Sequence, residues 1–170
     1  MKRWDIVIGL VILLVVGAFI FFSRKAQKQD GLQIITPTPQ TLAIQDKIEE
    51  NFKIQIPEDV DKAELTDVTG GSSSGIVTRK FENSIFTMAI LADLPEAGAG
   101  SLYQGWLARG QEGDGNFSLI NLGNLTLVKG GYMLNFRSSN DYTDHKNVVV
   151  TIESVNDTKA EKHILAGSFK

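Results

Sequence analysis

The sequence contains no cysteine, and this absence removes a set of possible chemistries. A chain without cysteine has no disulfide, no thiolate nucleophile, no cysteine-ligated zinc and no lipid-modified anchor cysteine. Histidine is scarce as well: His145 and His163 are the only two, and neither has a second ligand-type residue at helical or strand spacing. We therefore expect no metal site and no other cofactor, and a fold stabilised by packing alone.

Positive charge is in short supply too, because 17 Lys and Arg residues face 20 Asp and Glu residues. The imbalance is uneven along the chain. Residues 1–30 hold five basic and two acidic side chains, a net +3, so the remainder carries -6. Binding to nucleic acid needs a basic face. We therefore expect no nucleic-acid partner for this acidic chain.

No catalytic motif is recognisable. Ser72 to Ser74 lack the Gly-x-Ser-x-Gly setting of a hydrolase nucleophile. Five polar side chains beside glycines or in polar segments lack the spacing of a calcium loop and are interpreted as solvated turns: Glu112, Asp114, Asn116, Asp141 and Asp144. We expect a non-enzymatic protein without catalytic residues, and a cell-envelope hydrolase is an alternative that no pair of carboxylates supports.

The most prominent feature present is the apolar run from Ile6 to Phe22. As a helix it would be roughly 26 Å long, close to the hydrocarbon thickness of a bilayer. The run predicts a transmembrane helix over 4–22, after a short tail over 1–3 and before a polar, proline-containing linker over 23–41. Ser23-Arg24-Lys25 follows the run where a signal peptide would have small residues, which favours an uncleaved anchor. The flanking charges are balanced and leave the orientation open.

Residues 42–170 predict one domain that begins with a short amphipathic helix. Ile44, Ile48 and Phe52 recur at a spacing of four between polar, mostly acidic residues, which predicts a helix over 42–52. An acidic polar face is unfavourable for membrane-surface binding. We therefore expect this helix to pack on its own domain.

After a glycine- and serine-rich segment at 70–75, which predicts a flexible connection, the hydrophobic period becomes two. Extended segments are expected at 54–57, 63–68, 76–81, 86–90, 101–109, 116–122, 125–128, 132–136, 148–152 and 163–169. Many short strands between glycine-rich turns predict an all-β, antiparallel β-sandwich. Tyr103 and Trp106 fall on opposite faces of one strand, and although such an aromatic can anchor a ligand, we expect Trp106 in the core.

Two blocks of sequence resemble a known family. Leu94-Pro95 followed by Tyr103-Gln104-Gly105-Trp106-Leu107 resembles a signature of the extracytoplasmic domain of anti-sigma-K factors. Val148–Glu153 and Ile164–Gly167 are similar to the closing strands of that domain, and the likeness spans about 75–169. The resemblance implies a domain outside the cytoplasmic membrane, with the tail at 1–3 in the cytoplasm. It also implies structural roles at the matched positions, which are Leu94, Pro95, Tyr103, Trp106, Leu107, Val150, Thr151 and Glu153.

The expected function follows from the anchor and the resemblance together. Only a few residues precede the predicted helix, so we expect the chain to lack the family's cytoplasmic sigma-binding domain. We expect a single-pass cell-membrane protein with an extracytoplasmic sensing or interaction domain over 42–170, whose partner is an envelope protein or envelope component. An alternative is a regulator that acts through its membrane helix on a separate anti-sigma partner.

Overall fold

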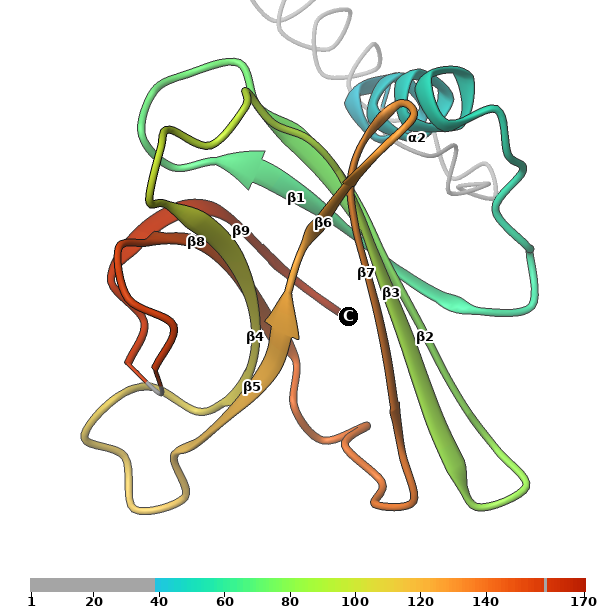
Figure 1. Cartoon of the computed structure of the whole chain (residues 1–170). Coiled ribbons are helices and arrows are strands. Elements are labelled where there is room, and N and C mark those ends of the chain that lie inside the picture. The colour runs from blue at the N-terminus through green and yellow to red at the C-terminus, as the bar shows by residue number, and fades with distance from the viewer. Residues whose placement is uncertain (1–38, 158) are drawn as a thin grey trace, which may run out of the picture. The chain divides into compact units, whose positions relative to one another are not determined.

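The computed structural model describes residues 39–157 and 159–170, which form one antiparallel sheet and one helix (Figure 1). The helix, α2, spans Pro39–Phe52. The strands are β1 (Asp61–Asp67), β2 (Ser74–Glu82), β3 (Ile85–Asp93), β4 (Leu102–Arg109), β5 (Ser118–Asn124), β6 (Thr126–Val128), β7 (Gly131–Ser138), β8 (Asn147–Glu153) and β9 (Lys162–Ser168). The prediction of an all-β, antiparallel domain with a short helix at its start is confirmed.

Most of the expected strands match the observed ones to within a few residues. The match arises because alternating apolar and polar residues in the sequence become alternating buried and exposed residues in a strand. In β3, for example, Phe86, Met88 and Ile90 are buried while Thr87 is exposed. The turn between β2 and β3 places Asn83 and Ser84 at positive φ, as tight hairpin turns require. The expected extended segment at 54–57 is wrong as a strand, since no sheet hydrogen bonding includes it.

The helix α2 packs against its own domain, as its spacing predicts. Ile48 is fully buried in a small cluster with Ile56, Ile76 of β2 and Leu91 of β3. Phe52 at the end of the helix packs against the same cluster. The cluster is separate from the main core, so α2 and that core lie on opposite faces of β2 and β3.

All nine strands belong to a single sheet in the order β5-β4-β8-β9-β1-β2-β3-β7-β6. The predicted division into two stacked sheets needs correction, because hydrogen bonding is continuous from β5 to β6. Figure 1 shows the sheet curling round on itself into a nearly closed, barrel-like shape. Its two edge strands follow each other in the sequence, and Leu125 between them donates a backbone hydrogen bond to Tyr103 of β4 at 2.8 Å.

The turn between β6 and β7 depends on glycine. Gly130 has φ +108°, and a Cβ there would lie 2.4 Å from the carbonyl oxygen of Asn51 in α2. Any other residue would both strain the backbone and collide with the helix. The glycine pair at 130–131 therefore makes the predicted hairpin and also permits close contact with the end of α2.

The main core fills the inside of the curled sheet. It is built from alternate residues of most strands, among them Leu65, Val77, Phe86, Ile90, Leu107, Leu134, Val148, Val150 and Leu165. Within residues 39–157 and 159–170, no helix is both long and apolar enough to cross a membrane. The predicted transmembrane helix over 4–22 lies outside the described residues, as does most of the predicted linker over 23–41.

Candidate functional site

Four of the family-like positions lie in the main core, on the inner face of the sheet: Leu94, Tyr103, Leu107 and Val150. The hydroxyl of Tyr103 donates a 3.2 Å hydrogen bond to the carbonyl oxygen of Pro95, which is itself exposed. Burial raises the pKa of the Tyr103 hydroxyl, and the neighbouring Tyr132 adds to this. The hydroxyl therefore stays protonated and holds the start of the β3–β4 loop against β4.

Trp106, Thr151 and Glu153 lie on the outer face of β4 and β8 and are just as buried, at 1%, 0% and 1% exposure. The indole Nε1 of Trp106 donates a 2.8 Å hydrogen bond to Oγ1 of Thr151. Both carboxylate oxygens of Glu153 accept from the backbone N–H of Glu161, at 3.0 and 3.1 Å. The carboxylate of Glu153 thus holds the β8–β9 loop against the outer face of the sheet. Trp106 is buried as expected, but it lies outside the main core.

Gln104 completes this outer-face group. Its Nε2 donates to Oδ1 of Asn124 at 3.0 Å and to Oδ1 of Asn156 at 2.6 Å. The side chain is 1% exposed, and its Oε1 is buried without a hydrogen-bond partner in the structure. Gln104 therefore links β4 to the end of β5 and to the β8–β9 loop.

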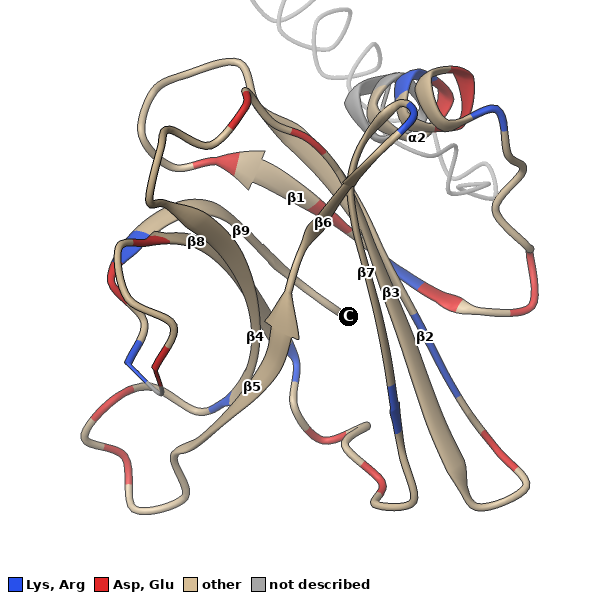
Figure 2. Cartoon of the chain, viewed as in Figure 1, with Lys and Arg blue, Asp and Glu red and all other residues tan. Residues whose placement is uncertain are grey.

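A cavity of about 700 Å³ opens on the outer face beside Trp106. Its floor includes Trp106 and Ala108 of β4 and Val149 of β8, and Phe117 and Leu119 form part of its wall. Phe117 and Leu119 are each 38% exposed. Figure 2 shows acidic segments on the β4–β5 loop and both basic and acidic segments on the β8–β9 loop, the two loops that also line the cavity. The volume lies in the range of ordinary ligand pockets.

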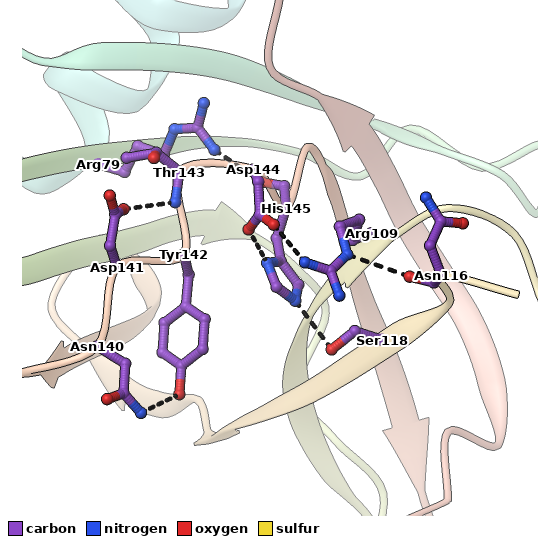
Figure 3. Close-up of polar contacts among 10 residues, drawn as sticks. All are labelled: Arg79, Arg109, Asn116, Ser118, Asn140, Asp141, Tyr142, Thr143, Asp144 and His145. Carbon is purple, nitrogen blue, oxygen red and sulfur yellow. Dashed lines mark hydrogen bonds and ion pairs between the residues drawn. The ribbon is translucent and has the colours of Figure 1, made fainter.

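A second polar group surrounds His145 in the β7–β8 loop (Figure 3). Nδ1 of His145 lies 2.6 Å from Oδ1 of Asp144, and Nε2 lies 2.9 Å from Oγ of Ser118 at the start of β5. A carboxylate can only accept, so Nδ1 carries the hydrogen. In the tautomer with hydrogen on Nδ1 alone, Nε2 accepts a hydrogen bond from the Ser118 hydroxyl.

The order serine, histidine, aspartate is the order of the relay that activates serine in hydrolases. Here, however, Arg109 forms an ion pair with the same aspartate, Asp144. That guanidinium is the main reason why the pKa of Asp144 lies below its usual range, and the hydrogen bond from His145 adds to it. A general base must become an imidazolium, and a carboxylate already neutralised by arginine stabilises this cation less. The electrostatics therefore favour a structural link over an activated nucleophile.

Arg79 of β2 holds the same loop from the other side. Its side chain is 5% exposed, and its NH1 donates to the carbonyl oxygen of His145 at 2.7 Å. Its Nε donates to Oδ2 of Asp61 at 3.2 Å, and the guanidinium carbon lies 3.9 Å from the centre of the Phe169 ring. One buried cation thus connects β1, β2, the β7–β8 loop and the C-terminal residues.

Tyr142 accounts for the position of this loop. Its ring makes edge-on contacts with Phe86, at 5.6 Å between ring centres, and with His145, at 5.4 Å. In Figure 1 the loop runs between the diverging ends of β5 and β7. The loop therefore fills the opening that incomplete closure of the sheet leaves, and the polar group around His145 fastens it there.

The sequence did not reveal this polar group. Asp144 was interpreted as a solvated turn residue, and Ser118 lies 27 positions away from His145. The one available signal was a histidine directly after an aspartate in a polar loop. Two other predicted turn residues do cap turns: Asp114 accepts from the backbone of Gln111, and Asp141 from that of Thr143. Within the described residues, no group of three or more His, Cys, Asp or Glu side chains could hold a metal ion.

The glycine- and serine-rich segment after β1 closes on the carboxylate of Asp67. Oδ1 accepts from the backbone and hydroxyl of Thr69, at 2.7 and 2.6 Å, and from the backbone of Gly71 at 3.1 Å. Oδ2 accepts from the backbone of Ser73 at 3.1 Å. These donors, with that of the Thr69 hydroxyl first, hold the pKa of Asp67 far below its usual range. Three backbone N–H groups of this loop, those of Thr69, Gly71 and Ser73, are therefore already bonded to a carboxylate of the chain itself.

No protein-family model matches the chain, and no curated protein and no solved structure matches it either. The structure by itself defines the class: an all-β domain whose single antiparallel sheet is nearly closed and carries one helix on its outer face. The resemblance to the outer domain of anti-sigma-K factors stays a prediction from the sequence.

Proposed function

We propose that this chain is a membrane-anchored, extracytoplasmic sensing or interaction domain without enzymatic activity, similar to the outer domain of anti-sigma-K factors. The transmembrane helix over 4–22 is part of this proposal. One observation carries most weight: the two sequence blocks that resemble the family are neighbouring strands. β4 pairs with β8, with Gly105 opposite Val150 and Gln104 opposite Thr151. A resemblance made of two separate blocks is stronger when both blocks contribute to one structural unit.

The contacts of the matched positions also support a role in building the domain. Tyr103 holds the loop that follows β3, Glu153 holds the β8–β9 loop, and Trp106 is tied to Thr151. The polar atoms of these side chains form hydrogen bonds with partners within the chain. Loops that are fixed on a rigid sheet provide a surface for recognition, as an interaction domain requires.

Cysteine accessibility in intact cells tests the location directly, because the natural chain has no cysteine to give a background signal. Ser72→Cys places a thiol on the exposed loop between β1 and β2. A membrane-impermeant maleimide should label this variant in intact cells. Lys2→Cys, in the predicted cytoplasmic tail, is the matched control and should be labelled only after the cells are opened.

The reverse pattern of labelling would place the domain in the cytoplasm and overturn the proposal. Labelling of Ser72→Cys only after opening, together with release of the chain into the soluble fraction, would overturn the anchor as well. Retention of the labelled chain in the membrane fraction after a carbonate wash is the result we expect for a spanning helix.

A hydrolase is the second candidate, favoured by the alignment of Ser118, His145 and Asp144. A fluorophosphonate probe tests it, because such probes form a covalent bond with an activated serine. We expect equal, background labelling of the natural chain and of Ser118→Ala. Labelling that is lost in Ser118→Ala and in His145→Gln would favour the hydrolase instead.

A further inference from the structure

The cavity beside Trp106 combines an apolar floor with charged groups of both signs at its margin. Trp106 lies in the floor with 1% of its surface exposed, and its Nε1 is already bonded to Thr151. The indole therefore offers a ligand neither a polar atom nor much ring surface, and the accessible apolar surface comes from Phe117 and Leu119, each 38% exposed, and from the partly buried Val149. Val149 and Ala108 extend the apolar surface on either side. A ligand that fits must bring an apolar body.

The charged groups come from different loops. Glu112 belongs to the β4–β5 loop, Lys159 to the β8–β9 loop, and His163 to the start of β9. In the described part of the chain, none of these three side chains has an ion pair or a hydrogen bond to another side chain. The backbone N–H of Lys159 donates to Oδ1 of Asp157 at 2.7 Å, which fixes the turn that carries it.

We propose that this cavity binds a zwitterionic ligand with an apolar side chain, of the chemical class of hydrophobic amino acids and short apolar peptides with free termini. The ammonium group of such a ligand pairs with Glu112, and its carboxylate pairs with Lys159 and accepts a hydrogen bond from His163. Its side chain lies against Phe117, Leu119 and Val149, next to the buried Trp106. The inference deepens the proposed sensing function and rests on it for its biological meaning.

Other ligand classes fit this combination less well. A polyanion would meet Glu112, and like charges in proximity are unfavourable. A purely apolar ligand would leave Glu112 and Lys159 partly desolvated without a partner, which costs free energy. The zwitterion is the class that uses the apolar floor and both charges together.

Fluorescence of Trp106 in the full chain provides the test. The chain has two tryptophans, so Trp4→Phe leaves Trp106 as the only one. The protein is held in detergent micelles and titrated with L-phenylalanine, with 3-phenylpropanoate, which lacks the ammonium group, and with phenethylamine, which lacks the carboxylate. Leucyl-phenylalanine is titrated as well, and its affinity shows whether the site prefers short peptides or free amino acids.

We expect saturable binding of the zwitterions, with a dissociation constant of roughly millimolar for so small a ligand. Each of the two probes with a single charge should bind about two- to fivefold more weakly, because each loses one exposed ion pair. Tighter binding of the dipeptide than of L-phenylalanine would assign the site to peptides. The reverse order would assign it to free amino acids.

Two variants connect binding to the named charges. In Lys159→Ala, L-phenylalanine should bind no more tightly than phenethylamine, because the partner of the carboxylate is gone. In Glu112→Gln, L-phenylalanine should bind no more tightly than 3-phenylpropanoate, because the partner of the ammonium group is gone. Lys129→Ala and Glu96→Gln are the matched controls, since both residues are exposed and neither lines the cavity.

Any of three results would overturn the inference. They are equal affinity for the three matched probes, the absence of a saturable signal, and binding that both variants leave unchanged. These outcomes leave the labelling pattern of Ser72→Cys untouched. Failure of the ligand site and failure of the proposed location are therefore separate results.

Discussion

The indole Nε1 of Trp106 and the hydroxyl of Thr151 form a 2.8 Å hydrogen bond across the β4–β8 pair. Both side chains are buried, Trp106 at 1% exposure and Thr151 at 0%. The N–H of an indole is a donor only, and within the described residues the hydroxyl oxygen of Thr151 is its one acceptor. Water has little access to this position, and loss of the acceptor would leave a buried donor unpaired.

Thr151→Val should therefore destabilise the protein by about 1–3 kcal/mol, although valine keeps the shape of threonine. Thr151→Ser keeps the hydroxyl and loses one methyl group, which should cost about 0.8 kcal/mol. Urea unfolding of the Trp4→Phe chain, followed by the fluorescence of Trp106, measures both. If Thr151→Val proves at least as stable as Thr151→Ser, the hydrogen bond contributes nothing measurable.

Asp67→Asn should destabilise the loop at 68–73, in a way that depends on pH. Asparagine can still accept from Thr69, but its amide would point a donor at the backbone N–H of Ser73. The folded-state pKa of Asp67 is lowered, so its contribution is present above the unfolded-state pKa of about 3.9 and is lost as the pH falls below that value. The difference in urea midpoint between the natural chain and Asp67→Asn should narrow steadily below about pH 4.

The control for this experiment is Asp141→Asn. Asp141 accepts one hydrogen bond, from the backbone of Thr143 at 2.9 Å, whereas Asp67 accepts four, three from backbone N–H groups and one from the Thr69 hydroxyl. We expect the midpoint of Asp141→Asn to differ little from that of the natural chain. A stability gap for Asp67→Asn that stays constant from pH 7 to about pH 3 would contradict the role assigned to its charge.

Local features of this fold were predictable from the sequence because they depend on residues close together in it. The spacing of Ile44, Ile48 and Phe52 gave a helix that packs on its own domain. Alternation placed Tyr103 and Trp106 on opposite faces of β4, but Tyr103, not Trp106, is the one in the main core. Alternation did not predict the position of the β8–β9 loop on the outer face of the sheet. Trp106 is buried outside the main core, on the outer face where Glu153 holds the β8–β9 loop, and no period in the sequence encodes the position of that loop.

The order of the strands and the polar group around His145 depend on contacts between distant residues. β1 pairs with β9, for instance with Thr66 opposite Ala166, and this pairing makes one curled sheet out of what could have been two. Ser118, His145 and Arg79 come from three separate segments. Each looks like an ordinary polar residue in the sequence. Only the pairing of the strands brings them together, so neither feature could be derived from spacing.

Arg79→Met should destabilise the protein by roughly 2–3 kcal/mol. Methionine preserves the apolar contact with Phe169 but leaves the buried carbonyl oxygen of His145 without its donor. Lys80→Met is the control, because Lys80 is the next residue in β2 and pairs with Asp59 in a partly exposed setting. An exposed pair contributes at most about 1 kcal/mol, so its loss should be small in the same urea experiment. Equal effects of the two substitutions would show that Arg79 does not hold the β7–β8 loop in place.

Gly167→Ala should be among the most damaging single-methyl additions. A Cβ at Gly167 in β9 would lie 1.9 Å from the carbonyl oxygen of Glu64 in β1, and backbone cannot move aside as a flexible side chain can. We expect a loss of about 3 kcal/mol or more, since β1 and β9, which pair in the middle of the sheet, must separate. Gly98→Ala is the matched control, because a Cβ there meets no atom within 4 Å. Thermal unfolding of both variants measures the effect, and a melting temperature for Gly167→Ala equal to that of Gly98→Ala would mean that β1 and β9 are not as closely paired as the structure has them.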